Sequence, residues 1–318
     1  MSAPTTTTTT SPPSPRRRRI VGVSTKMYFS ASQTSHYITS LLSLLSSSPP
    51  ATLSLLRSRV DIFFIPDHLT LLSSITALSS PSAPAPVPEI LPGAQDAHHA
   101  DAGPYTGEVS PRVLAELGCR LLEINHAERR RLFGETDASA ALKVEAAARN
   151  AMTPLLCVGE VTRPAYLLDS PDSPESPTAD QVEAGAAAAA DEIAARLGTL
   201  LSRLDPAADA VLAYEPVWAI GAARPAGADH VVGVARRLRR LECVARRTGT
   251  TRIVYGGSAG PGLFAKLARG GGGGGGRGEE EVEEEGEEEG DAVDGLFLGR
   301  FAHDPEQFYK TILEVAEA

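Results

Sequence analysis

The stretch Ala210-Val211-Leu212-Ala213-Tyr214-Glu215-Pro216 places an acidic residue directly after a short apolar run. Such a run, without alternating polar residues, is typical of a strand that is buried on both faces in a parallel sheet. Proline has no N–H to donate to a neighbouring strand, so Pro216 stops the ladder of hydrogen bonds. We therefore predict a strand over 210–213 that carries Glu215 at its carboxyl end.

Outward from this strand, seven further short apolar runs alternate with segments of helical periodicity. The predicted strands are 20–24, 60–65, 89–91, 120–124, 154–158, 210–213, 252–255 and 295–298. The predicted helices are 31–47, whose buried stripe would be Leu41, Leu42, Leu44 and Leu45, and 69–78, 110–117, 138–151, 179–204, 228–248, 260–268 and 304–315. Eight alternating strand–helix units predict an α/β fold, a closed (β/α)8 barrel.

A doubly wound open sheet is the structural alternative to the barrel. It would carry a G-x-G-x-x-G phosphate-binding turn after its first strand. Residues 22–26 instead have the sequence Gly-Val-Ser-Thr-Lys, which lacks this pattern. The first turn therefore favours the barrel.

The domain organisation predicted for the 318 residues is a single barrel domain over 20–318. A Thr/Pro/Arg-rich tail, 1–19, precedes it, and two low-complexity inserts interrupt it at about 169–177 and 270–290. The second insert joins a helix to the next strand, a connection that barrels place on the face opposite the chemistry. The first insert follows a strand and would therefore lie on the active face.

Charge and composition exclude several classes of function. The net charge is −10, and the segment 277–291 supplies most of it with nine Glu and one Asp against one Arg. The nearly neutral remainder offers no broad basic face for nucleic acid. We find no apolar run of about 18 residues and no secretory leader, so we expect a cytoplasmic protein without membrane contact. An organelle transit signal in the Arg-containing tail is the alternative location.

Polar residues follow several of the predicted strands, and a barrel brings all these strand ends into one ring. Lys26 follows the first strand, His126 and Glu128 follow the fourth, and Glu215 follows the sixth. Glycine-rich turns follow the seventh and eighth strands, where the backbone N–H groups of barrels commonly bind phosphate. These turns contain Gly256, Gly257, Ser258, Gly299 and Arg300. The pattern indicates an enzyme that acts on a small phosphorylated molecule.

The same residues stand in motifs that resemble the triosephosphate isomerase family from Ile20 to the C-terminus, apart from the inserts. The matching motifs are Lys26-Met27, Gln95 with Tyr105-Thr106-Gly107-Glu108, His126-Ala127-Glu128-Arg129-Arg130, Phe133-Gly134-Glu135, Cys157-Val158-Gly159-Glu160, the stretch 214–221, Tyr255-Gly256-Gly257-Ser258 and the stretch 294–299. The resemblance implies a TIM barrel, an intramolecular oxidoreductase and a place in glycolysis and gluconeogenesis. It implies no metal and no organic cofactor.

The resemblance also implies a role for each site residue. Glu215 would be the base that moves a proton between adjacent carbons, His126 would polarise the carbonyl, and Lys26 would stabilise the enediolate. This family is itself an established example of a carboxylate base paired with a neutral imidazole, so that pairing is taken from the family. The implied phosphate- and substrate-binding residues are Ser24, Lys26, Gly221, Ser258, Gly299 and Arg300. Supporting residues would be Glu128, Tyr255, Gly256 and Gly257.

Two loops complete the implied site. The lid over the substrate would consist of Pro216, Val217, Trp218, Ala219, Ile220, Gly221, Ala222 and Ala223. The segment 94–108 resembles the loop that family members insert into a neighbouring subunit, so a homodimer is expected. Its residues would include Gln95, Thr106 at the tip and Glu108.

The sequence also departs from the family around the predicted site. The family has Asn where Ser24 stands, Gly and Ser on either side of the histidine where Asn125 and Ala127 stand, and Gly where Arg300 stands. The resemblance therefore implies, first, an aldose–ketose isomerase that interconverts dihydroxyacetone phosphate and D-glyceraldehyde 3-phosphate. The alternative is an isomerase of a four-carbon ketose phosphate such as L-erythrulose 1-phosphate, because related bacterial enzymes have Ser and Gly-Arg at these places. A catalytically silent barrel with a binding role is the third hypothesis.

Overall fold

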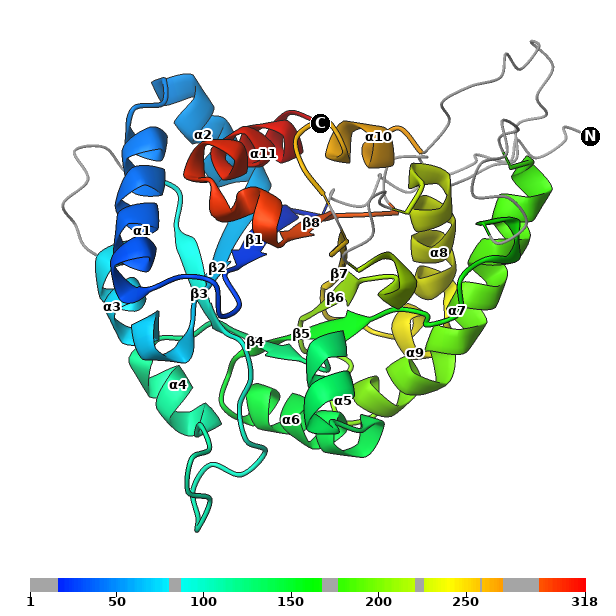
Figure 1. Cartoon of the computed structure of the whole chain (residues 1–318), viewed down its shortest axis with the longest axis horizontal. Coiled ribbons are helices and arrows are strands. Elements are labelled where there is room, and N and C mark those ends of the chain that lie inside the picture. Colours follow the sequence, from blue (N-terminus) through cyan, green and yellow to red (C-terminus); the bar gives the residue numbers. More distant parts are fainter. Residues whose placement is uncertain (1–16, 80–86, 168–176, 221–225, 258, 271–291) are drawn as a thin grey trace, which may run out of the picture.

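The eight predicted strands form one closed, all-parallel barrel in a computed structural model of the chain (Figure 1). The structure describes residues 17–79, 87–167, 177–220, 226–257, 259–270 and 292–318. The strands are β1 (Arg19–Ser24), β2 (Val60–Ile65), β3 (Ile90–Ala94), β4 (Leu121–Ile124), β5 (Thr153–Val158), β6 (Ala210–Tyr214), β7 (Thr251–Tyr255) and β8 (Gly295–Leu298). Each strand pairs with the next in sequence, and β8 pairs with β1 to close the ring. The predicted fold class is confirmed.

Helices between the strands surround the barrel (Figure 1). They are α1 (Ala31–Ser46), α2 (Pro50–Arg59), α3 (His68–Leu78), α4 (Pro111–Leu117), α5 (Ala127–Phe133), α6 (Asp137–Arg149), α7 (Ala179–Leu201), α8 (Ala228–Arg240), α9 (Glu242–Ala245), α10 (Phe264–Ala268) and α11 (Pro305–Glu317). Among the described residues, short 3₁₀ turns lie in the loops that follow β5, β6 and β8, namely η1 (Ala165–Leu167), η2 (Val217–Ala219) and η3 (Arg300–His303).

Several predicted elements differ from the structure. The helix predicted over 228–248 is broken at Leu241, which has extended backbone dihedrals, and α10 begins at Phe264 instead of residue 260. Helices α2 and α5 were not predicted. In α1, Leu41 and Leu45 are buried as expected, but Leu42 and Leu44 are partly exposed because Tyr37 and Ile38 complete the buried face.

Apolar side chains fill the barrel and the layer around it. Alternate residues of each strand point inward, as the twofold repeat of a strand requires. The interior cluster consists of Ile20, Phe63, Ile65, Leu121, Leu155, Cys157, Val211, Ala213, Val254 and Phe297. A larger cluster packs the helices onto the outer face of the barrel. The interior is therefore a packed core that holds the strand ends in fixed positions beneath the loops.

The predictions about membrane spans, the N-terminal tail and the two inserts can be compared with the structure only where it describes the residues. Within the described residues, no helix is both long enough and apolar enough to cross a membrane. Residues 1–16 of the predicted tail lie outside the described residues, whereas Arg19 belongs to β1. The inserts at 169–177 and 270–290 also lie outside them, apart from Pro177 and Gly270.

Candidate active site

The carboxylate predicted at the end of the sixth strand lies directly after β6 and is almost fully buried. Glu215 is 7% exposed, and its N–H donates to the Val158 carbonyl at 2.8 Å. A Cβ atom at Gly159 would overlap the backbone carbonyl of Glu215, and one at Gly256 would overlap its side chain. Glycine at these two positions lets the neighbouring strand ends approach Glu215 closely and confine its carboxylate.

Burial determines the proton affinity of this carboxylate. Removal from water raises the pKa of Glu215 to about 7, with Lys26 opposing that shift and Glu128 adding to it. A carboxylic acid with such a pKa exchanges protons near neutral pH, which is the property of a general base. Glu215 can therefore both take and return a proton.

His126 lies opposite Glu215 and is held in one tautomer by the start of α5. Its Nδ1 accepts the N–H of Glu128 at 3.1 Å, so the ring proton of the neutral imidazole is on Nε2. The Nε2 atom is 3.5 Å from Oε2 of Glu215. Burial, followed by the charge of Lys26, lowers the pKa of His126 to about 4. The imidazole is therefore neutral and presents an N–H donor to the space beside Glu215.

Lys26 brings a cation to the same place from the loop after β1. Its Nζ is 2.8 Å from Oε1 of Glu128, and the hydrogen bond and charge of Glu128 raise its pKa although burial alone would lower it. The backbone of Lys26 has φ of +47°, a strained conformation for a residue with a side chain. Gln95 donates its Nε2–H to the Lys26 carbonyl at 2.7 Å and so helps to hold this conformation.

Asn125, which stands where the family has glycine, has φ of +68°. Asparagine adopts this region more readily than other side-chain-bearing residues. Its N–H donates to Oε1 of Glu135 at 2.8 Å, its Nδ2 donates to the Cys157 carbonyl at 2.8 Å, and Arg130 donates to its Oδ1 at 2.7 Å. These three bonds fix the turn that positions His126.

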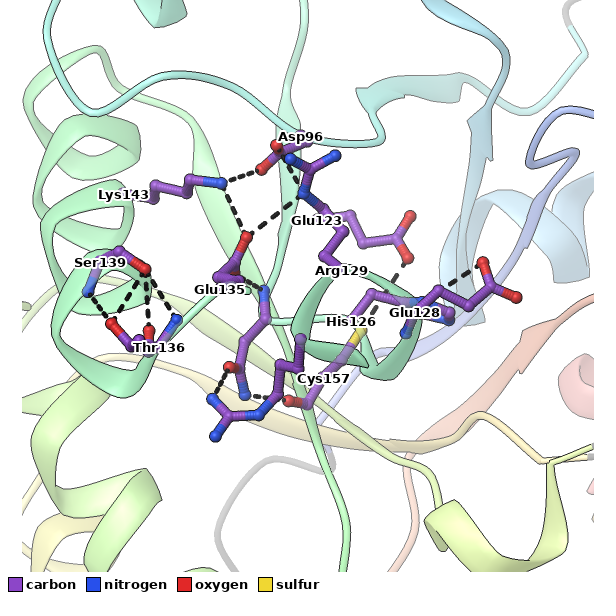
Figure 2. Close-up of polar contacts among 12 residues, drawn as sticks. Asp96, Glu123, His126, Glu128, Arg129, Glu135, Thr136, Ser139, Lys143 and Cys157 are labelled. Carbon is purple, nitrogen blue, oxygen red and sulfur yellow. Dashed lines mark hydrogen bonds and ion pairs between the residues drawn. The ribbon is translucent and has the colours of Figure 1, made fainter. Parts of the chain in front are cut away.

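A buried network of ion pairs supports this turn from behind. Lys143 lies between Asp96 and Glu135, with Nζ–O distances of 2.6 and 2.7 Å, and Arg129 contacts the same two carboxylates (Figure 2). Losing one charge from such a network would leave its buried partners uncompensated. The network therefore ties α6 and the loop after β3 to the His126 turn.

The base of the predicted lid is fixed by another buried carboxylate, Glu160. Its Oε1 lies 2.7 Å from the Trp218 Nε1–H, and it also contacts the hydroxyl of Tyr214 and Nε2 of His230 at 3.2 Å each. The lid residues Val217 to Ala219 form η2, and Ile220 lines the cavity described next. The remaining lid residues, Gly221, Ala222 and Ala223, lie outside the described residues.

One cavity of about 540 Å³ at the carboxyl ends of the strands joins most of the predicted site residues. It is lined by Ser24, Lys26, Tyr28, Glu123, His126, Glu128, Glu215, Ile220, Gly256, Gly257, Ala259, Phe297, Leu298, Gly299, Arg300, Phe301 and His303. Tyr255 is buried beneath it and is not part of the lining, and Ser258 lies outside the described residues.

Sequence reasoning missed several residues of this lining, above all Glu123, His303 and Tyr28. His303 contacts the Ser24 carbonyl through Nε2 at 3.2 Å, and its ring packs against that of Tyr28. Glu123 could have been noticed as an acidic residue inside the apolar run Leu121-Leu122-Glu123-Ile124. Within the described part of the chain, no group of three or more His, Cys, Asp or Glu side chains could hold a metal ion.

The two groups that face each other across this cavity complement one another chemically. A carboxylate with a pKa near neutrality can remove a proton from carbon, while an imidazole N–H donates to the oxygen on the adjacent carbon. A (β/α)8 barrel with these groups at its carboxyl end belongs to the class of isomerases that move a proton between neighbouring carbons.

Comparison with known protein families agrees with this class. The sequence model of the family described as triosephosphate isomerase matches residues 19–276. The chain belongs to the triosephosphate isomerase family.

Individual relatives carry two different names. An L-erythrulose-1-phosphate isomerase of Pectobacterium atrosepticum is 40% identical over 288 residues, which are 91% of this chain and 92% of that protein. A Brucella melitensis protein of the same name is 35% identical over 229 residues, 70% of this chain and 73% of that protein. A triosephosphate isomerase of Leifsonia xyli subsp. xyli is 36% identical over 215 residues, 66% of this chain and 73% of that protein.

Proposed function

We propose that this protein isomerises a four-carbon ketose phosphate, L-erythrulose 1-phosphate, by proton transfer through an enediolate. The observation that carries the proposal is the 40% identity to an L-erythrulose-1-phosphate isomerase across more than nine-tenths of both chains. It favours the tetrulose alternative over the triose substrate that the family resemblance first implied. The glycolytic role expected with the triose is therefore not carried over.

In this proposal, three side chains that line the cavity each have one role in the reaction. Glu215 removes the proton from the carbon next to the carbonyl and returns it to the former carbonyl carbon. The Nε2–H of His126 donates to the oxygen on which negative charge develops, and the ammonium of Lys26 stabilises the same charge. Because Glu215 and His126 are buried and Lys26 is partly buried, these interactions are stronger than they would be in water.

The chemical structure of the substrate determines what the product is. In L-erythrulose 1-phosphate the carbonyl is at C2, and the adjacent C3 carries both a proton and a hydroxyl group. Transfer of the C3 proton to C2, together with transfer of the hydroxyl proton from O3 to O2, therefore moves the carbonyl to C3 and gives a second ketose phosphate. The aldose–ketose description expected for the triose substrates does not apply to this reaction.

Two departures from the family pattern support a longer substrate. Ser24 is buried at the cavity wall and has a smaller side chain than the asparagine of the family. Arg300 lines the cavity beside Gly299, where its planar guanidinium can bind phosphate oxygens or a substrate hydroxyl group. Together they add space and a hydrogen-bond donor.

Steady-state kinetics with both substrate classes test the proposal. The purified protein should have a higher kcat/KM for L-erythrulose 1-phosphate than for dihydroxyacetone phosphate or glyceraldehyde 3-phosphate. Arg300→Gly should reduce this preference by about 1 to 3 kcal/mol, which is about 5- to 150-fold. A wild-type preference for glyceraldehyde 3-phosphate would refute the tetrulose proposal. It would instead support triosephosphate isomerase activity, which is the name that the Leifsonia relative carries.

We also propose that the protein is a homodimer through the loop that contains Thr106 and Glu108. Both residues are exposed in the single chain, and the loop projects from the barrel (Figure 1). Met27, next to Lys26, is 88% exposed, and Leu69 is 95% exposed, so both apolar side chains are accessible to a second subunit. Light scattering should give the mass of two chains. An active monomer at micromolar concentration would contradict the dimer.

A further inference from the structure

An acidic side chain stands among the apolar residues that fill the barrel interior. Glu123 lies on β4 two residues after the inward-pointing Leu121 and is 4% exposed. Its Oε1 lies 4.0 Å from Sγ of Cys157, another interior residue. Neither the barrel core nor the roles proposed for Glu215 and His126 require a carboxyl group at this position.

The second oxygen of this carboxyl group is buried and unpaired. Among the described residues, Oε2 of Glu123 has no hydrogen-bond partner. Burial, and then the charge of Glu215, raises the pKa of Glu123 well above its ordinary value, which favours the protonated acid. A protonated carboxyl group offers one O–H donor together with acceptor lone pairs. Buried polar groups in folded proteins are nearly always satisfied, so an unpaired one at a cavity calls for a ligand.

Glu123 lines the same cavity as Glu215 and His126. Figure 2 shows its side chain extending toward the side on which His126 and Glu128 project. In the closed order from β1 to β8, β4 lies across the barrel from β8. A substrate whose phosphate is bound at the ends of β7 and β8 therefore directs its other end toward β4.

The tetrulose and triose phosphates differ at that other end. Relative to dihydroxyacetone phosphate, L-erythrulose 1-phosphate has an added hydroxymethyl group on the carbon that loses its proton. The reacting carbons therefore lie between this hydroxymethyl group and the phosphate. A hydroxyl group there needs one donor and one acceptor, which a protonated carboxyl group supplies.

We propose that Glu123 is a specificity-determining residue that hydrogen-bonds the terminal hydroxyl group of a four-carbon ketose phosphate. The inference rests on the proposed function and names the group that distinguishes its substrate from a triose phosphate. A triose phosphate lacks this hydroxyl and leaves the buried carboxyl group unpaired in the complex. Sites that bind a substrate hydroxyl discriminate strongly against analogues without it, because their own polar groups then remain unpaired.

Two variants of nearly the same size test the role of the carboxyl group. Glu123→Gln keeps a donor and an acceptor, whereas Glu123→Met removes both and keeps most of the volume. The measured quantity is the ratio of kcat/KM for L-erythrulose 1-phosphate to kcat/KM for dihydroxyacetone phosphate. We expect Glu123→Met to lower this ratio about 10- to 100-fold and Glu123→Gln to keep it within about threefold.

Controls separate this effect from general damage to the barrel. Leu121→Val, on the same face of β4 but outside the cavity lining, should leave the ratio unchanged. Inhibition by 2-phosphoglycolate, which has no hydroxymethyl group, should be the same in wild type and Glu123→Met. The melting temperature of Glu123→Met should equal or exceed that of wild type, because an unpaired buried polar group is removed.

The possible results distinguish this inference from the proposed function. If the wild type prefers the triose but the ratio still falls in Glu123→Met, the proposed function is wrong and the role of Glu123 stands. If the wild type prefers the tetrulose and Glu123→Met slows both substrates equally, the role of Glu123 is refuted and the function stands. A wild type without measurable tetrulose turnover overturns both.

Discussion

At the scale of single residues, the position of the Glu215 carboxylate is the most constrained feature of the cavity. Gly159 lies against the backbone of Glu215 and Gly256 against its side chain, and Nε2 of His126 is 3.5 Å from Oε2 of Glu215. Glu215→Asp withdraws the carboxylate by about 1 Å, and we expect kcat to fall about 10²-fold or more. Steady-state assays on the folded variant measure this loss of kcat. The control Glu242→Asp, at an exposed position on α9, should leave kcat unchanged. Near-wild-type turnover of Glu215→Asp would remove Glu215 from the mechanism.

The raised pKa of Glu215 gives opposite pH dependences for activity and stability. The base must be ionised, so kcat/KM should fall as the pH drops below about 7. The folded protein binds this proton more tightly than the unfolded chain does, since the pKa rises from 4.5 to about 7 on folding. The resulting stabilisation is fully present below pH 4.5 and is lost as the pH rises through about 7.

Glu215→Gln does not titrate and isolates this contribution to stability. Its free energy of unfolding, relative to wild type, should increase between pH 4.5 and 7 by on the order of 3 kcal/mol. Urea unfolding at several pH values measures the difference. A difference that stays constant over this range would show that burial does not raise the pKa of Glu215.

At the scale of elements, the loops after β1, β3 and β4 hold one another in place. Gln95, directly after β3, supports the strained backbone of Lys26, whose ammonium contacts Glu128 at the start of α5. Gln95→Ala removes one hydrogen bond to this loop, so we expect kcat/KM to fall about 5- to 10-fold while the fold remains intact. Gln307→Ala, on α11 and outside the cavity lining, is the matched control. Equal kinetics for the two variants would mean that Lys26 is positioned without Gln95.

The same loops show which features could be predicted from the sequence. Strand ends were located because apolar runs end at polar residues or proline, and a barrel brings all of these ends together. Glu123 was missed because periodicity alone does not tell an inward acid from an outward one in a run of four residues. The positive φ angles of Lys26 and Asn125 could not be predicted from the sequence. Lys26 is held by Gln95, which is distant in sequence, and Asn125 is held by Glu135, which it contacts only once the turn has folded.

Helix α2 was missed for a different reason. Its sequence, Pro-Ala-Thr-Leu-Ser-Leu-Leu-Arg-Ser-Arg, buries only Leu53 and Leu56, so it lacks the regular apolar stripe by which helices are recognised. Packing against α11 and β2 holds α2 in the layer of helices around the barrel. Tertiary contacts therefore determine this helix more than its own periodicity does.

At the scale of the whole molecule, the Gly/Glu insert carries most of the net charge of the chain. It joins α10 to β8, and such connections lie at the amino ends of the strands, whereas the cavity lies at their carboxyl ends. A variant that joins Arg269 to Asp291 through a short linker should keep kcat and KM within about twofold. A large loss of activity in folded protein would show that the insert reaches the cavity.

The pairing of β1 with β8 has a consequence for how the chain is made. Of the eight barrel strands, β8 is the last in sequence, so one edge of β1 has no partner strand until β8 has been synthesised. Arg239 and Arg17 then contact Asp294 beside this seam. Because an open strand edge can pair with another chain, the nascent barrel is exposed to misassembly until β8 has been synthesised. We therefore expect the chain to depend on chaperones while it is being synthesised and not after the barrel has closed.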